Sequence, residues 1–124
     1  MTEGVVEVSA EDQVRMNRYS RLNTRSKELE EEVGQLKAKI RTCEDAQEEL
    51  SLVLEEDAIM LALGEAFFPV SEDEAEAKIS QARSLAEELK NTRETEAQEI
   101  FAEMDALKKS LYAKFGKSIN LEDN

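Results

Sequence analysis

The chain has 124 residues, of which 36% are charged and 5% aromatic, with no tryptophan and no histidine. This composition suits an elongated helical protein better than a domain built around a large core. The formal net charge of −13 argues against a nucleic-acid partner, because phosphate binding requires a basic surface. The single cysteine, Cys43, excludes an intramolecular disulfide and a cysteine-based zinc site.

The first residues, MTEGVVEVSAE, lack the apolar stretch of a signal peptide. No window of the sequence reaches the roughly 18 consecutive apolar residues of a membrane span. The single cysteine also fits a reducing compartment. We therefore expect a soluble cytoplasmic protein, able to enter the nucleus in part, without a membrane partner.

Residues 1–8 show no periodicity and are predicted to be a loose tail. A first helix is predicted over 9–56, where the Ser9 hydroxyl is placed to accept from the backbone N–H of Asp12. Apolar side chains then recur at alternating intervals of three and four residues, which is the heptad seam of a coiled coil. The seam consists of Tyr19, Leu22, Leu29, Val33, Leu36, Ile40, Cys43, Leu50 and Leu54, with Ser26 and Gln47 as polar members.

The apolar run 57–70, DAIMLALGEAFFPV, is predicted to be a β-hairpin that turns at Gly64-Glu65. In this register Leu63 pairs with Ala66, and both faces of the hairpin are apolar. An isolated two-stranded hairpin is barely stable and has two open edges. We therefore expect strands from other chains to cover it. The side chains predicted at this interface are Ile59, Met60, Leu61, Leu63, Phe67, Phe68 and Val70.

A second helix is predicted over 71–115, with Ser71 as its N-cap residue and Glu74 completing a capping box. Gly116 is suited to end this helix. The remaining residues, 116–124, are predicted to be a short C-terminal tail.

Both helices have similar lengths and their own caps, so the sequence predicts a mainly α fold in which they form an antiparallel coiled coil joined by the hairpin. A long parallel homodimeric coiled coil is the alternative. The heptad repeat of the second helix is out of phase at Arg93, where we expect the coil to bend. In the antiparallel arrangement both termini lie at one end, which we call the tip.

The tip is predicted to be basic, since segments 11–27 and 105–117 contain nine bases against three acids. A solvated helix surface explains this charge, but so does attraction of acidic partners. Apolar residues rimmed by charge are typical of a protein-binding surface. Among them, Met16, Tyr112 and Phe115 are predicted to be the most exposed. The complete predicted set is Val14, Met16, Tyr19, Leu22, Leu111, Tyr112 and Phe115, with the bases Arg15, Arg18 and Lys114.

Signatures of catalysis are missing from the sequence, which has no glycine-rich phosphate loop and no histidine base. Cys43 lies on the heptad seam and is interpreted as a small core residue rather than a nucleophile. The carboxylates form solvated helix faces and lack the spacing of a calcium loop. We expect neither enzymatic activity nor a cofactor or metal site.

A helix, an apolar hairpin around Gly64-Glu65-Ala66-Phe67 and a second helix resemble the β-class subunits of prefoldin. The ends carry the more specific similarity: Glu11-Asp12-Gln13 with Asn17 and Tyr19, and the closing segment LYAKFG followed by INLE. The resemblance covers roughly residues 10–122. Glu65 departs from the aspartate more usual there, and Phe68-Pro69 departs in the second strand.

The resemblance implies a hetero-hexamer of two α-class and four β-class subunits, joined through their hairpins into a double β-barrel. This chain would then assemble with two α-class and three further β-class subunits. It also implies that the tips hold unfolded proteins, notably actin and tubulin, and deliver them to the cytosolic group II chaperonin without ATP. A structural coiled-coil adaptor or tether without chaperone activity is the alternative function, but it would not explain an apolar hairpin between two capped helices.

Overall fold

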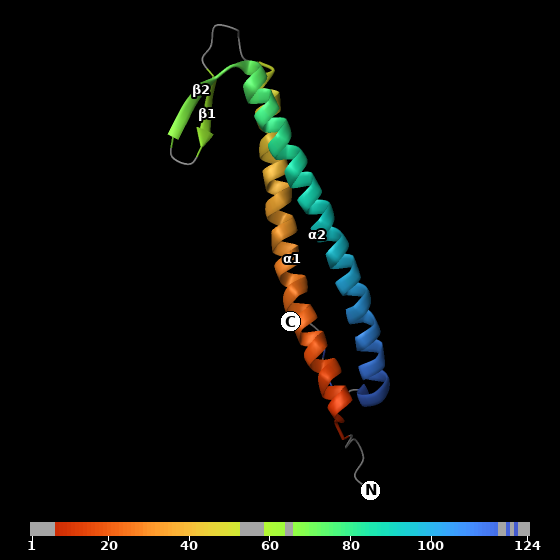
Figure 1. Ribbon diagram of the computed structural model, residues 1–124. Helices are drawn as coiled ribbons and strands as arrows, with labels where there is room; N and C mark the ends of the chain where they lie inside the picture. Colours follow the sequence, from red (N-terminus) through yellow and green to blue (C-terminus); the bar gives the residue numbers. More distant parts are fainter. Residues whose placement is uncertain (1–6, 53–58, 64–65, 117–118, 120, 122–124) are drawn as a thin grey trace. The chain divides into compact units, whose positions relative to one another are not determined.

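The computed structural model describes residues 7–52, 59–63, 66–116, 119 and 121. The elements in chain order are helix α1 (Ala10–Leu50), strands β1 (Ile59–Leu63) and β2 (Ala66–Val70), and helix α2 (Glu72–Phe115), as Figure 1 shows. Within these ranges, neither helix is long and apolar enough to cross a membrane. The same ranges contain no group of three or more side chains able to hold a metal ion.

The chain divides into two compact units. The terminal unit comprises residues 1–31 and 94–124, and the hairpin unit comprises residues 32–93. The division falls next to Arg93, the residue at which the heptad repeat of α2 is out of phase. The terminal unit contains both basic segments that were predicted to meet at the tip.

Both helices begin at the predicted capping residues. The Ser9 hydroxyl accepts from the backbone N–H of Asp12 at 3.1 Å, and the Asp12 carboxylate accepts from the N–H of Ser9 at 3.3 Å. At the start of α2, the Ser71 hydroxyl accepts from the N–H of Glu74 at 3.1 Å. These bonds satisfy amide groups that have no partner within the first turn of a helix.

The two helices end differently. Helix α1 ends at Leu50, before the predicted end at Glu56, and the chain then tightens: the N–H of Leu52 donates to the carbonyl of Glu49 at 3.0 Å, three residues back. The prediction was therefore wrong for the first residues after Leu50, and residues 53–58 lie outside the described ranges.

Helix α2 ends at Phe115, as predicted, and is followed by Gly116. Gly116 has a φ of 57°, the left-handed conformation expected of a glycine that terminates a helix.

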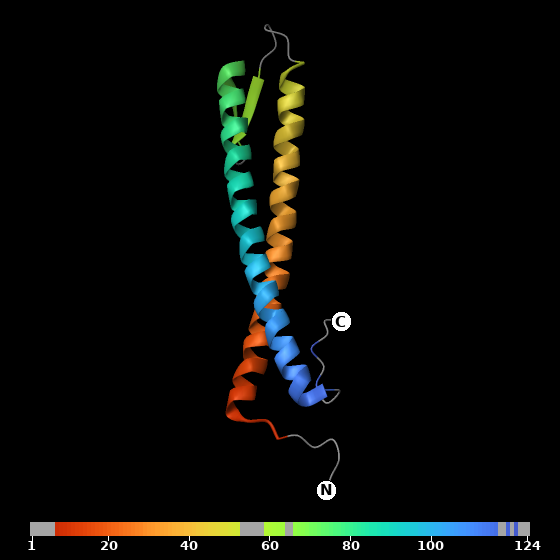
Figure 2. The same cartoon turned by 90° about the vertical axis from the view of Figure 1, so that its right-hand side faces the viewer.

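In the terminal unit, the first part of α1 packs antiparallel to the last part of α2, shown in red to orange and in blue in Figure 2. The arrangement follows from the ion pairs, since Arg18 bonds Glu103 and Arg25 bonds Glu96. The core of this unit is a cluster of apolar seam residues. It consists of Leu22, Leu29 and Ile100, with Ala97, Met104 and Leu107 packed against them.

In the hairpin unit, the helices are also antiparallel, because Arg83 of α2 pairs with Glu44 of α1 and donates to Gln47. The buried residues here are smaller than in the terminal unit, and they include Cys43 and Ala86. Leu89 of α2 remains 38% exposed. Small residues contribute little buried apolar area, so this part of the coil is packed more weakly.

Strands β1 and β2 form an antiparallel two-stranded sheet. Leu63 pairs with Ala66, and the pairing continues to Ile59 and Val70 at the other end. The predicted turn at Gly64-Glu65 lies outside the described residues. Pro69 lies within β2 without interrupting this register. The backbone of the seven predicted interface residues is described, whereas their side chains lie outside what the structure describes.

Candidate functional site at the paired helix ends

All ten residues predicted for the tip lie in the terminal unit, but their exposure differs. Val14 is 63% exposed and Met16 is half-buried on the first turns of α1. Tyr19, Leu22 and Leu111 are buried, and Leu22 belongs to the core cluster. Val14 and Met16 therefore remain available for binding, whereas the buried residues stabilise the helix pair.

The prediction that Phe115 is exposed was wrong. Its side chain is 6% exposed, and the other aromatic residue of this segment, Tyr112, is half-buried. The reason is its position on α2: Phe115 lies four residues after the fully buried Leu111, so both side chains lie on the same buried face of the helix. The ammonium of Lys114 also lies 5.6 Å from the centre of the Phe115 ring, within cation–π range.

Asp12 is the buried charged residue of the terminal unit, with 1% of its surface exposed. Its carboxylate forms ion pairs with Lys114 of α2 and with Arg15, the latter at 3.1 Å. Sequence reasoning placed Asp12 only as a donor to the Ser9 cap and missed its role as an acceptor. The antiparallel register could have predicted the ion pair with Lys114, because it places the start of α1 opposite the end of α2.

The surroundings of Asp12 lower the pKa of its carboxyl from 3.8 to about 2. The main cause is the hydrogen bond from the Lys114 ammonium, which opposes the effect of burial, and the bonds from Ser9 act in the same direction. Asp12 is therefore ionised at neutral pH and holds the two helix ends together through charge-assisted bonds.

The predicted bases are largely engaged within the chain. Arg18 forms a two-pronged ion pair with Glu103 at 2.5 and 2.9 Å. This pair raises the pKa of Arg18 and lowers the pKa of Glu103, chiefly through the hydrogen bonds between them. Arg15 binds Asp12 within α1 and Lys114 binds it from α2, so these two bases of the tip are engaged in ion pairs.

Two tyrosine hydroxyls bind the main chain of a single residue in the C-terminal tail. Tyr19 of α1 donates to the carbonyl of Leu121 at 3.0 Å. The N–H of Leu121 donates to the hydroxyl of Tyr112 of α2, also at 3.0 Å. Sequence reasoning interpreted both tyrosines as apolar tip residues and missed this pair of bonds, because nothing local to either tyrosine predicts a partner in the tail.

A shallow pocket of about 340 Å³ lies at the start of α1. Ala10, Glu11, Val14 and Arg15 line it, so an exposed apolar side chain is flanked by charges of both signs. This combination fits a surface that contacts another protein.

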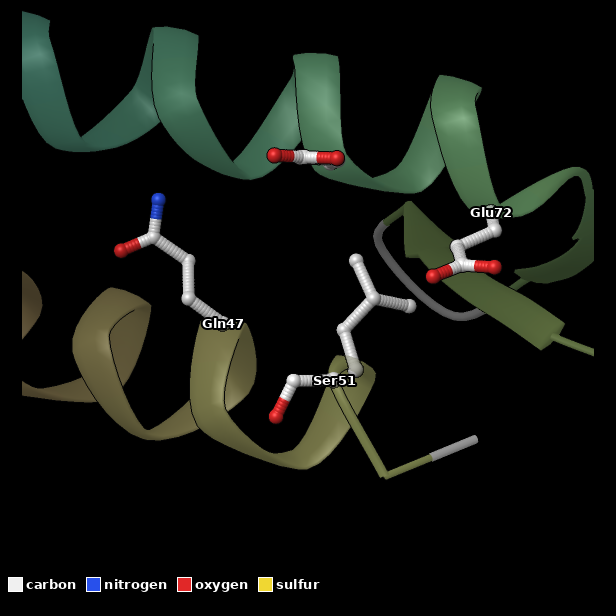
Figure 3. Close-up of a pocket in the computed structure, with 5 residues that line it drawn as sticks. Gln47, Ser51 and Glu72 are labelled. Atoms are coloured by element: carbon white, nitrogen blue, oxygen red, sulfur yellow. The ribbon is translucent and has the colours of Figure 1, made fainter. Parts of the chain in front are cut away.

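A second pocket, of about 220 Å³, lies in the hairpin unit between the end of α1 and the start of α2 (Figure 3). It is lined by Gln47, Leu50, Ser51, Glu72 and Glu76. The Gln47 amide is already bonded to Ser80 and Arg83. The lining residues offer no pairing of a nucleophile with a base, so the pocket has no catalytic arrangement.

The sequence matches the family model described as prefoldin subunit over residues 13–118. Proteins named prefoldin subunit 4 are similar over nearly the whole chain. The Bos taurus protein is 34% identical over 119 residues, covering 94% of this chain and 88% of its own. The Homo sapiens protein is 33% identical with the same coverage. The Saccharomyces cerevisiae protein is 28% identical, covering 94% of this chain and 90% of its own.

The fold is similar to the crystal structure of the prefoldin beta subunit from Thermococcus strain KS-1. The TM-score is 0.78, and the alignment covers 90% of this chain and 98% of the archaeal chain at 10% identity. The paired helices therefore match a solved prefoldin subunit in architecture. From the family model and the curated relatives, the chain belongs to the prefoldin subunit family, whose members are subunits of a co-chaperone.

Proposed function

We propose that the chain is one subunit of a hetero-hexameric, ATP-independent co-chaperone that captures unfolded proteins at its terminal unit. The proposed clients include actin and tubulin, and the proposed recipient is the cytosolic group II chaperonin. Membership of the prefoldin subunit family implies assembly with other prefoldin subunits. The stoichiometry, the clients, the recipient and a cytoplasmic location belong to the proposal.

The observation that carries this proposal is that apolar side chains near the start of α1 are accessible. Val14 is 63% exposed and Met16 is half-buried, and Arg15 lies between them in the sequence. Exposed apolar side chains next to charges suit weak contact with the apolar segments that an unfolded protein exposes. Methionine is flexible and polarisable, which suits contact with varied sequences.

Assembly is proposed to run through the hairpin. The described strands form a sheet of two, so within this part of the chain each strand has one edge without a partner strand. Open strand edges pair readily with strands of other chains. Hairpins from neighbouring subunits would supply these partners and cover the apolar faces.

Holding an unfolded protein requires no chemical reaction. Ligands that bind the unfolded state preferentially reduce the concentration available for aggregation by mass action. Several weak sites on one assembly bind one long client far more tightly than a single site does. This mechanism agrees with prefoldin subunits being chaperone components rather than enzymes.

The test is a Val14→Ser, Met16→Ser variant in the reconstituted assembly. Suppression of the aggregation of denatured actin, followed by light scattering, should require several times more of the variant than of the unchanged assembly. The matched control is Leu85→Ser, because Leu85 is also exposed (54%) but lies in the hairpin unit. Equal suppression by all three assemblies would contradict the assignment of the surface.

Delivery is tested separately by transfer of labelled actin from the assembly to the chaperonin. The adaptor hypothesis makes a different prediction, namely that the chain alone forms a homodimer and suppresses no aggregation. Light scattering coupled to size-exclusion chromatography distinguishes that homodimer from a chain that needs partner subunits.

A further inference from the structure

The two tyrosine hydroxyls at Leu121 have the chemistry of a binding site for an extended peptide. One hydroxyl donates and the other accepts, and together they satisfy both polar groups of one residue's main chain. Bonds to the main chain do not depend on the identity of the bound side chain. The site can therefore accept any segment that presents an extended backbone.

The positions of the two hydroxyls come from rigid elements. Tyr19 is 8% exposed and lies on the seam of α1, and Tyr112 lies next to the fully buried Leu111 on α2. The ammonium of Lys108 lies 5.9 Å from the centre of the Tyr112 ring. These contacts position both hydroxyls toward the main chain of Leu121.

The side chains that accompany the bound main chain are apolar. Ile119 and Leu121 are separated by one residue in the sequence, and both are half-buried. In an extended chain, residues two apart point to the same side. In sequence, two apolar residues separated by a polar one are also a pattern of extended apolar segments in unfolded proteins.

We propose that Tyr19 and Tyr112 form a main-chain binding site for extended apolar segments, that Leu121 of the chain's own tail occupies it, and that a client segment binds by displacing the tail. The identity of the ligand as a client rests on the proposed function. The tail competes because its tether gives it a high effective concentration at the site. A short apolar segment on its own then cannot displace the tail. A client that is held at several subunits at once can displace the tail.

The two tyrosines of the chain allow this site to be observed directly by fluorine labelling. Tyr19 and Tyr112 are its only tyrosines. This subunit, labelled with 3-fluorotyrosine and reconstituted with unlabelled partner subunits, should give two fluorine resonances that report on the site alone. The comparison uses the full chain, a chain ending at Ser118, and a full-length Leu121→Pro variant, which removes the N–H without shortening the chain.

Truncation at Ser118 and Leu121→Pro should each shift both resonances, and the peptide KSINLEDN should return them toward their original positions. The truncated chain should bind this peptide about tenfold more tightly than the full chain, because the tethered tail no longer competes. A peptide with N-methyl-leucine in place of leucine should bind about five- to tenfold more weakly, since it lacks only the donor to Tyr112. Circular dichroism checks that the helices are intact.

Resonances unchanged by truncation, or equal binding of the N-methylated peptide, would overturn the proposal. The aggregation of denatured actin is measured on the same preparations, where the truncated assembly should suppress aggregation at a lower concentration than the full-length one. Unchanged suppression would overturn competition by the tail. Absence of suppression by the full-length assembly would instead refute the proposed function, and the peptide measurements would still decide whether the site exists.

Discussion

The carboxylate of Asp12, in the first turn of α1, forms an ion pair with the ammonium of Lys114, in the last turn of α2. The two residues are far apart in the sequence, and their pairing connects the ends of both helices. The pKa of Asp12 is lowered from 3.8 to about 2, mainly by this bond. A carboxyl with a lower pKa in the folded state stabilises the fold only while it is ionised.

The contribution of Asp12 to stability should therefore be complete above about pH 4 and should disappear as the pH falls toward 2. In Lys114→Met, the pKa of Asp12 should rise toward its ordinary value, so the loss of stability between pH 4 and pH 2 should become smaller. Thermal unfolding followed by circular dichroism at several pH values measures the difference.

The matched control is Lys109→Met, because Lys109 pairs with Asp105 on the same helix, and its side chain is 77% exposed. The loss of stability of Lys109→Met between pH 4 and pH 2 should equal that of the unchanged chain. If Lys114→Met lost as much stability between pH 4 and pH 2 as the unchanged chain, the ion pair would not be the cause of the lowered pKa of Asp12.

Leu29 should be among the residues that contribute most to stability, because its side chain is 0% exposed and packs in the cluster with Leu22 and Ile100. Leu29→Ala should lower the free energy of unfolding by about 2–5 kcal/mol, through lost burial and the cavity that remains. Leu85→Ala, at a 54% exposed position, should change it by less than about 0.5 kcal/mol. Urea denaturation measures the free energy of unfolding of both variants. Equal losses would contradict the assignment of Leu29 to the core.

Two glycines should respond to the same substitution with opposite sign. Gly34 lies within α1, and a Cβ atom there would meet nothing within 4 Å, so Gly34→Ala should stabilise the chain by up to about 1 kcal/mol. Gly116 has a φ of 57°, so Gly116→Ala should destabilise it by about 1–2 kcal/mol although space is available. Urea denaturation measures both, and stabilisation by Gly116→Ala would contradict the left-handed helix terminus.

The hairpin can be tested through assembly. Leu61 and Phe68 are paired across the two strands, and replacing both with lysine should prevent the subunit from co-purifying with the other subunits. A buried ammonium without a partner is strongly unfavourable at an apolar interface. Leu52→Lys is the control, because Leu52 is 77% exposed outside the strands. Undiminished co-purification of the double variant would refute assembly through the hairpin.

Much of the helical architecture was predictable because it depends on neighbours in the sequence. The described members of the predicted α1 seam are all buried or half-buried, from Tyr19 to Leu50. The cap at Ser71 and the terminus at Gly116 also follow from local preferences. The end of α1 did not follow in this way, since no strong stop signal separates Leu50 from the apolar run.

The exposure of individual site residues was less predictable. Met16 and Tyr112 are half-buried, whereas Phe115, expected to be as accessible, is buried. Phe115 shares the buried face of α2 with Leu111, four residues earlier, a relation that its residue type alone did not reveal. A count of charges also does not reveal pairing: Arg18 and Lys114 are bonded to carboxylates of the opposite helix.

Two capped helices, their apolar seam and the lack of histidine could be read from the sequence, because capping and periodicity act over a few residues. Only the tertiary structure decided which charges pair, where Asp12 is buried, and that Tyr19 and Tyr112 bind Leu121 from opposite helices. These contacts join residues up to 102 positions apart. Their geometry depends on the register of two helices and the path of the tail, which no local pattern specifies.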